Sequence, residues 1–280
     1  MKHAGREADF QSINGRLWAL RSAAMLVGLL LGAPIAAATS YSFAITLSAA
    51  LCACAFPVAF LMREPAHVLE RTREPYLRTL FSGVREAWRR PTLRYLFAFS
   101  GVVGAGAAGP LLLLQQPWLA EHGIRTAQLG VWQGPVQAAE ILAALAAGRL
   151  LSRLGGRGAF LALPLTLSLC CAALAGVDSL WIAAAFFGVA GVRGLHHPLL
   201  AGYVNRRIES SRRATLLSVQ SVAGNVAMAV AWPLAGVAAD VFGLPGAFLM
   251  YAIGALTLGG GALLLWDRAE RREAARSEAC

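Results

Sequence analysis

Long apolar runs of about 20 residues occupy most of this 280-residue chain, and a run of that length crosses a bilayer when it forms an α-helix. Eight such runs are found, at residues 17–38, 42–62, 94–120, 126–151, 158–177, 179–203, 214–240 and 246–266. The hydrophobic fraction is 57% and the charged fraction is 14%, a composition far from that of soluble domains. The chain is therefore predicted to be an all-α integral membrane protein with about eight transmembrane helices.

The positive residues are distributed unevenly over the segments that connect these runs. Of the 25 lysines and arginines, only Arg125 falls on one side of the predicted membrane, while Arg21 and Arg193 fall within runs. All the others fall in the two terminal segments, in connections on the opposite side, or, like Arg94 and Arg149, at the run ends that adjoin those connections. Because positive residues collect on the cytoplasmic face, both termini are predicted to be cytoplasmic, in a multi-pass protein of the cell membrane. The same distribution explains the net charge of +10 without a nucleic-acid partner.

Polar side chains interrupt several of the apolar runs. Two sets recur with helical spacing, so that each set shares one helix face, namely Gln133, Gln137 and Glu140, and Arg193, His196 and His197. A charge buried in hydrocarbon is costly, so ionisable residues in such runs mark transport pathways or structural ion pairs. Glu140 is predicted to bind a proton or a cationic substrate and to have Arg193 as a counter-charge, while Arg193 and the histidines contact the substrate or stabilise one conformation. The alternatives are a structural ion pair or positions nearer the membrane interface.

Motifs for enzymatic chemistry are absent from the sequence. It contains no H-E-x-x-H, G-x-S-x-G or P-loop pattern. Four of the five cysteines lie inside apolar runs, and none has the spacing of a zinc site. No enzyme, no cofactor and no metal site are therefore predicted. An intramembrane enzyme that uses Glu140 with His196 and His197 is the less favoured alternative.

The chain is predicted to have four parts. Residues 1–62 form a partial N-terminal bundle of two spans, 63–93 a basic linker, 94–266 a six-helix bundle and 267–280 a cytoplasmic tail. Within the linker, Leu77, Leu80, Phe81, Val84 and Trp88 recur at helical spacing. This pattern predicts an amphipathic helix on the membrane surface, and a plain basic linker is equally compatible.

Four segments resemble parts of one transporter family, and they occur in the same order. The segment Gly148-Arg-Leu-Leu-Ser-Arg-Leu-Gly-Gly-Arg157 resembles the loop between helices eight and nine of the major facilitator superfamily, with signature G-x-x-x-D-R-x-G-R-R. Ser152 stands at the position of the aspartate. The other three segments, 116–123, 205–218 and 233–243, resemble the end of helix seven, the loop between helices ten and eleven, and the end of helix eleven.

The resemblance implies that the eight runs correspond to helices five to twelve of a twelve-helix transporter, with the first four helices missing. In that family helices seven, eight, ten and eleven line the central cavity. The candidate substrate and coupling residues on these helices are Gln115, Gln116, Gln133, Gln137, Glu140, Arg193, His196, His197 and Asn225. The loop residues that would form a cytoplasmic gate are Gly148, Arg153, Gly156 and Arg157.

The function implied by the resemblance is transport of a small organic solute by alternating access, with a proton as the expected coupling ion. The segment Gly28-Leu-Leu-Leu-Gly-Ala-Pro34 resembles, with one residue inserted, the G-x-x-x-G-P signature of antiporters, which favours efflux of drugs or metabolites. Alternating access needs two helical bundles. The alternative is therefore a truncated, non-transporting fragment, or a subunit that another chain completes with the missing helices.

Overall fold

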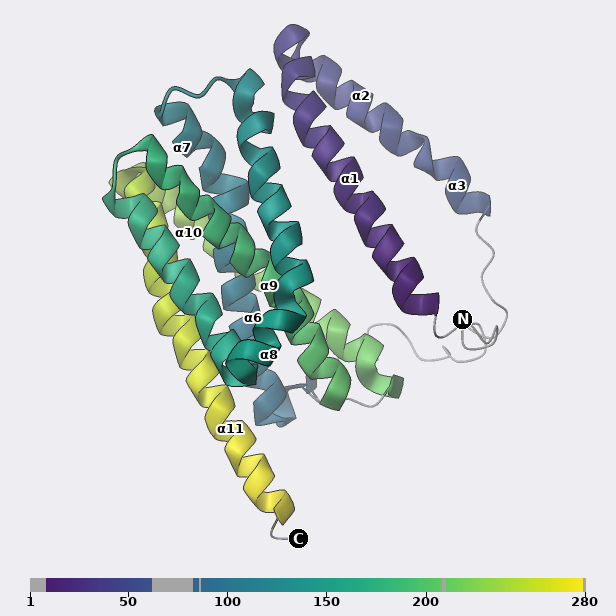
Figure 1. Ribbon diagram of the computed structural model, residues 1–280, viewed down its shortest axis with the longest axis vertical. Coiled ribbons are helices and arrows are strands. Elements are labelled where there is room, and N and C mark those ends of the chain that lie inside the picture. The colour runs from purple at the N-terminus through teal and green to yellow at the C-terminus, as the bar shows by residue number, and fades with distance from the viewer. Residues whose placement is uncertain (1–8, 62–82, 86, 208–209, 279–280) are drawn as a thin grey trace.

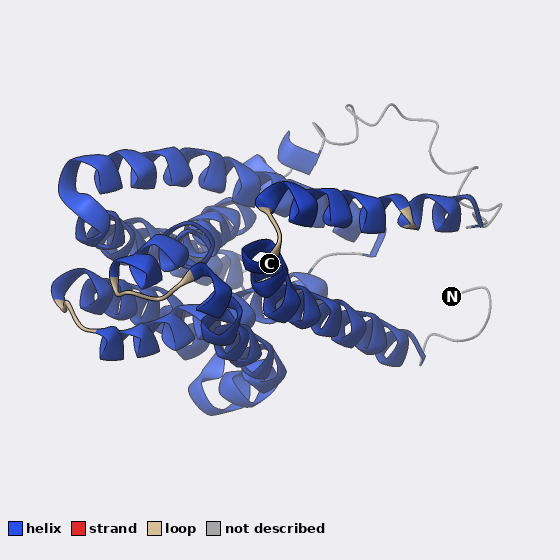
Figure 2. Cartoon of the chain, turned by 90° about the horizontal axis from the view of Figure 1, so that it is seen from above, coloured by secondary structure: helices blue, strands red, loops and turns tan. Residues whose placement is uncertain are grey.

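The computed structural model describes residues 9–61, 83–85, 87–207 and 210–278. Within these ranges the chain is helical apart from short turns and contains no strand (Figures 1 and 2). The α-helices are α1 (Asp9–Ala38), α2 (Tyr41–Ala53), α3 (Ala55–Leu61), α6 (Pro91–Gly109), α7 (Gln115–Glu121), α8 (Leu129–Gly176), α9 (Ala185–Arg207), α10 (Ser210–Gly254) and α11 (Gly260–Glu278). Two π-helical segments, η2 (Pro110–Leu114) and η5 (Ala255–Gly259), and two 3-10 turns, η3 (Thr126–Gln128) and η4 (Leu180–Ala184), lie between them. The predicted all-α fold is confirmed.

The helices α8 and α10 are both too long to cross a membrane once. The apolar stretch that includes α8 has 51 residues and would extend about 77 Å as one straight helix, against a hydrocarbon core of about 30 Å. Each helix is broken by a glycine with positive φ, Gly155 (φ 69°) in α8 and Gly243 (φ 71°) in α10. Because a side chain disfavours this conformation, glycine permits the chain to turn there. Figure 1 shows that both helices double back, so each supplies two passes.

The described helices thus make eight passes. They are α1, α2 with α3, α6 with α7, the two arms of α8, α9, and the two arms of α10, the second of which continues into α11 (Figure 1). Four stretches are long and apolar enough to cross a membrane, Tyr41–Val58, Pro91–Glu121, Thr126–Gly176 and Leu216–Glu273. The less apolar α9 is not among them, because it carries Arg193, His196 and His197.

Most passes match the predicted runs, and the differences lie at the ends. The third pass begins at Pro91 instead of residue 94, since proline is well tolerated in the first helical turn. The last helix continues past residue 266 to Glu278, through the segment expected to be a tail. Of the surface helix predicted over residues 77–88, positions 77–82 and 86 lie outside the described ranges, and 83–85 and 87–89 are helical.

The core is formed by α6, α8, α9, α10 and α11. The ring of Phe160, from the second arm of α8, contacts Phe99 of α6, Tyr203 of α9 and Trp266 of α11, with centroid separations of 5.8, 6.2 and 5.4 Å. The apolar window within Pro91–Glu121 is 72% buried, whereas no residue of Tyr41–Val58 is buried. The α1 to α3 hairpin therefore lies at the side of the bundle, as Figure 1 shows.

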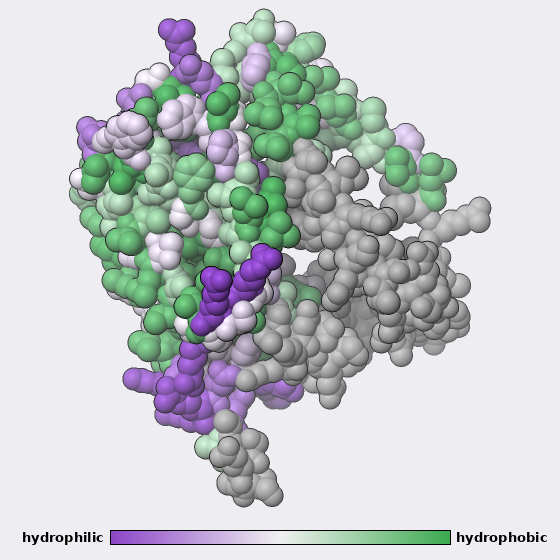
Figure 3. Space-filling model, in the orientation of Figure 1, coloured by the Kyte–Doolittle hydropathy of each residue, from purple (hydrophilic) through white to green (hydrophobic). Residues whose placement is uncertain are grey.

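Six of the described arginines lie near one end of the bundle, and we call it the basic end. Its members are Arg149, Arg153 and Arg157 near the turn of α8, and Arg268, Arg271 and Arg272 in α11. Figure 3 shows hydrophilic residues gathered around the C-terminal part of the molecule, below a largely hydrophobic face. At this end Asp267 pairs with Arg157, and the Thr92 hydroxyl donates to Glu273 Oε1 at 2.9 Å. These contacts attach the last turns of α11 to the rest of the bundle.

Candidate functional site

An ion pair joins α8 to α9 in the interior of the bundle. Arg193 Nη1 lies 3.2 Å from Glu140 Oε2, and Gln137 Nε2 donates to the same carboxylate oxygen at 3.4 Å. The two charged side chains are only 27% and 20% exposed. Glu140 lies near the middle of the first arm of α8, which runs from Leu129 to the break at Gly155. A carboxylate and a guanidinium are thus held together far from either end of that arm.

The two helices approach closely at this pair because a glycine lies between them. A Cβ atom added to Gly194 of α9 would lie 2.9 Å from the carbonyl carbon of Glu140 and 3.2 Å from Ala143 Cβ. Distances below 3.0 Å are essentially never seen for a real Cβ atom. The absence of a side chain at Gly194 therefore allows α9 to pack directly on the backbone of Glu140, and this approach brings the neighbouring Arg193 within reach of the carboxylate.

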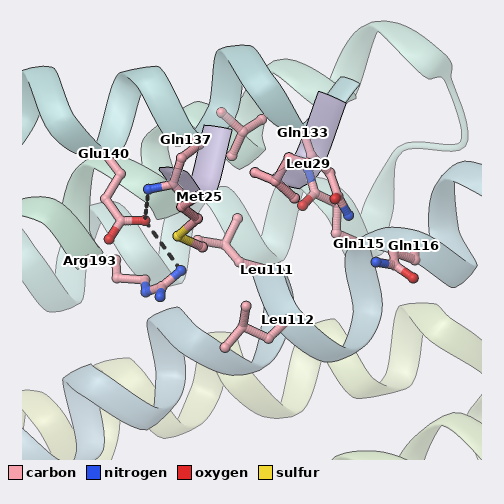
Figure 4. A pocket seen from close by; sticks show the side chains of 11 residues that line it. Met25, Leu29, Leu111, Leu112, Gln115, Gln116, Gln133, Gln137, Glu140 and Arg193 are labelled. Atoms are coloured by element: carbon pink, nitrogen blue, oxygen red, sulfur yellow. Dashed lines mark hydrogen bonds and ion pairs between the residues drawn. The ribbon is translucent and has the colours of Figure 1, made fainter. Parts of the chain in front are cut away.

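A cavity of about 140 Å³ opens beside the ion pair, between α1, the η2 and α7 part of the third pass, α8 and α9. It is lined by Met25, Leu29, Leu111, Leu112, Gln115, Gln116, Gln133, Val136, Gln137, Glu140 and Arg193. Figure 4 shows Glu140, Gln137 and Arg193 at one end of this cavity. Gln115, Gln116 and Gln133 lie at the other end, with apolar side chains between the two polar groups. The cavity therefore offers a charged end, an apolar middle and an amide end.

The third pass changes its helical geometry just where it reaches the cavity. Pro110 has no N–H to donate, and the chain continues as the π-helix Pro110–Leu114 before α7 begins. A π-helical turn contains one more residue than the regular pattern, so it rotates every side chain that follows. Leu111, Leu112, Gln115 and Gln116, which lie within or directly after this segment, line the cavity. The π-helix is thus part of how the amides are oriented.

The position of α1 also contributes to the cavity. A Cβ atom on Gly130, at the start of α8, would lie 3.1 Å from the carbonyl carbon of Leu29, so α1 packs against α8 at a glycine. This contact places Met25 and Leu29 over the side chains of α8. Sequence reasoning missed both residues, because a methionine and a leucine in an apolar run carry no signal that distinguishes them from lipid-facing neighbours.

The cavity collects six of the nine candidate site residues, namely Gln115, Gln116, Gln133, Gln137, Glu140 and Arg193. The other three, His196, His197 and Asn225, are not among the residues that line it. Asn225 is exposed on α10, and His197 is exposed on α9 with its ring 5.1 Å from that of His196. The helical spacing grouped Arg193 with the histidines, but neighbours on one face of α9 contact different helices.

His196 belongs to a separate buried cluster. Its Nε2 lies 3.1 Å from the hydroxyl oxygen of Ser100 on α6, and Gln220 Nε2 of α10 donates to the same oxygen at 3.5 Å. The side chains of His196 and Ser100 are both 4% exposed. This cluster joins three helices, and it was missed in the sequence because Ser100 is an isolated small polar residue that gives a weak signal by itself.

The predicted gate residues lie at the turn between the two arms of α8. Gly148, Arg153 and Gly156 are exposed there, and Arg157 pairs with Asp267 of α11. The residue with positive φ is Gly155, which stands at the second glycine of the family signature but was not among the predicted gate residues. Asp267 was missed as well, since it lies far away in the sequence and only the fold brings it to the loop.

Among the described residues no group of three or more histidine, cysteine or acidic side chains could hold a metal ion.

Comparison with known proteins agrees with this architecture. No curated protein matched the chain in a sequence search. The sequence profile of the Major Facilitator Superfamily matches residues 102–279, which includes most of the third pass and the whole of α8 to α11. This match covers more than half of an all-helical, multi-pass chain, and the chain therefore belongs to the major facilitator superfamily of membrane transporters.

Proposed function

We propose that this protein is a secondary active transporter that moves a small organic solute by alternating access, with Glu140 as the proton-binding group. The observation that carries the proposal is the Glu140 to Arg193 ion pair at one end of the 140 Å³ cavity. Ionisable residues inside membrane helices are costly, and in transporters they commonly bind the substrate or the coupling ion.

Protonation of Glu140 would change the forces in the cavity. The ionised carboxylate attracts Arg193 and accepts from Gln137, and neutralising it removes the attraction between opposite charges. The pair joins α8 to α9, so its loss weakens a contact between two cavity-lining helices. A change of protonation can therefore favour one arrangement of the helices over another, which is what proton coupling requires.

The proposed orientation places the basic end in the cytoplasm of the cell, with both termini on that side. Arginines gather at this end, and positive residues favour the cytoplasmic face. Efflux is the direction that the resemblance of residues 28–34 to an antiporter signature favours. In the structure α1 carries these residues, and its Met25 and Leu29 cover the cavity. A movement of α1 relative to α8 would open the cavity.

The test of this function is transport by the purified chain in liposomes that contain a pH-sensitive dye. A panel of labelled small acids, amines and neutral solutes is applied, and proton movement that accompanies solute movement is recorded against empty liposomes. We expect Glu140→Gln to abolish solute-coupled proton movement. The matched control is Glu121→Gln, because Glu121 is an exposed carboxylate at the end of α7 and outside the cavity. Coupling that survives Glu140→Gln would refute the proposed role of this carboxylate.

A second candidate is a subunit that transports only after another chain adds helices to the α1 to α3 side. This candidate is favoured by the apolar stretch Tyr41–Val58, in which no residue is buried. It predicts that the purified chain binds solutes but does not transport them until the partner is present. Transport by the chain alone, at a rate independent of protein density in the liposome, would exclude it.

A further inference from the structure

The charges and donors of the cavity indicate which class of solute it accepts. Arg193 carries five N–H donors, and among the described residues its guanidinium contacts only Glu140, in an ion pair whose Nη1 and Oε2 atoms lie 3.2 Å apart. Glu140 is more fully engaged, because its Oε2 pairs with Arg193 and accepts a hydrogen bond from Gln137, and the residue has a further interaction besides these two. The remaining capacity to bind a ligand therefore lies with the cation, and a guanidinium recognises carboxylates in particular.

The charge of the Glu140 and Arg193 pair determines when an anion can bind. With Glu140 ionised, the pair is neutral, and an anion that approached Arg193 would be repelled by the carboxylate 3.2 Å away. With a proton on Glu140, the pair carries one positive charge, which an anion of one negative charge neutralises. Binding of the proton and binding of the anion therefore favour one another, and each must raise the affinity for the other by the same factor.

The rest of the cavity limits the size and shape of the solute. Its volume of about 140 Å³ is below the range of roughly 300 to 1,000 Å³ that holds drug-sized ligands. Next to the charged end lie the apolar side chains of Met25, Leu111 and Leu112, and only then the glutamine amides (Figure 4). These surroundings suit a short apolar body attached to one charged group.

We propose that the cavity binds a small organic monoanion, whose carboxylate takes the place of Glu140 on the guanidinium of Arg193 when Glu140 takes up a proton from the water that enters the cavity. No other bond changes in this exchange. The inference rests on the transporter function proposed above and specifies its substrate class. It also implies that proton and solute cross the membrane together, in contrast to the exchange that residues 28–34 suggest.

The experiment measures binding to the purified full-length chain by calorimetry, with three probes that have the same apolar body, namely butyrate, butylamine and butyramide. We expect butyrate to bind most tightly, and its affinity to rise as the pH falls from about 7.5 to about 5.5, by up to about tenfold per pH unit for one linked proton. The variant Glu140→Gln should bind butyrate at the higher pH as tightly as the native protein does at the lower pH. Its affinity should no longer depend on pH.

Replacing Arg193 tests the anion site directly. Arg193→Gln alone would leave Glu140 without its cation and could unfold the protein, so the double variant Glu140→Gln with Arg193→Gln is used, which removes both charges. It should lose butyrate binding at least about tenfold, the factor that corresponds to 1.4 kcal/mol. The matched control is Arg125→Gln, because Arg125 is exposed and outside the cavity, and its binding should be unchanged.

The inference is overturned if butylamine binds more tightly than butyrate, if the double variant binds butyrate like the native protein, or if none of the three probes binds. These outcomes are distinct from failure of the proposed function. Proton-coupled transport that is lost in Glu140→Gln, together with a preference for butylamine, would support the proposed transporter function and refute the proposal that the substrate is an anion. Butyrate binding as expected, with proton coupling unchanged in Glu140→Gln, would support the anion site and refute the proposed role of Glu140 in coupled transport.

Discussion

Replacing Gly194 with alanine should destabilise the protein and weaken the ion pair next to it. The new Cβ would lie 2.9 Å from the carbonyl carbon of Glu140, whereas ordinary van der Waals contact begins at 3.4 Å. The carbonyl oxygen of Glu140 would lie closer still, so the two helices must separate by more than about 0.5 Å, because a backbone carbonyl cannot rotate out of the way. A separation of that size along the pair would lengthen its 3.2 Å distance to more than about 3.7 Å.

Overpacking a close contact between helices lowers the free energy of unfolding by about 1 to 3 kcal/mol. Alanine also favours helix over glycine by about 1 kcal/mol, and this gain must be subtracted with a control. Gly191 supplies it, since it precedes Gly194 by three residues in α9 and an added Cβ there meets nothing within 4 Å. The difference between the free energies of unfolding of Gly194→Ala and Gly191→Ala isolates the steric cost.

The assay is equilibrium unfolding of both variants in detergent micelles, followed by tryptophan fluorescence. We expect Gly194→Ala to be less stable than Gly191→Ala by about 1 to 3 kcal/mol. Solute-coupled proton movement should fall in the same variant, because its carboxylate is less firmly held. Equal stability of the two variants would show that the helices are not in contact at Gly194, and the account of how the ion pair is positioned would then be wrong.

Three further changes test other parts of the structure, each by the same unfolding measurement. Ser100→Ala should cost about 1 to 3 kcal/mol, because it removes a hydrogen-bond partner from the buried ring of His196; no loss would show that water replaces the hydroxyl. Tyr251→Phe should leave stability unchanged or raise it, because the buried hydroxyl has no partner among the described residues, and a loss above about 1 kcal/mol would reveal one. Arg157→Gln should cost at most about 1 kcal/mol, and less in high salt, because its pair with Asp267 is partly exposed; a larger, salt-independent loss would contradict this.

The sequence was sufficient to predict the fold class, since apolar runs and positive residues report directly on the bilayer. It also singled out Glu140 and Arg193 as opposite charges, because charges within apolar helices are rare enough to be informative singly, and the structure pairs the two residues. Helical spacing was a weaker guide to which residues act together. It placed His196 beside Arg193 on α9, yet His196 contacts Ser100 of α6 and Arg193 contacts Glu140 of α8.

The sequence by itself determined that this chain is a helical membrane protein, because the solvent around it imposes the length, composition and charge of each segment. Only the tertiary structure decided which side chains meet. The cavity depends on the close approach at Gly194, on the π-helix that follows Gly109, and on α1 lying against Gly130. Such contacts depend on how the surfaces of helices far apart in sequence fit together, and local patterns of hydrophobicity do not predict this fit.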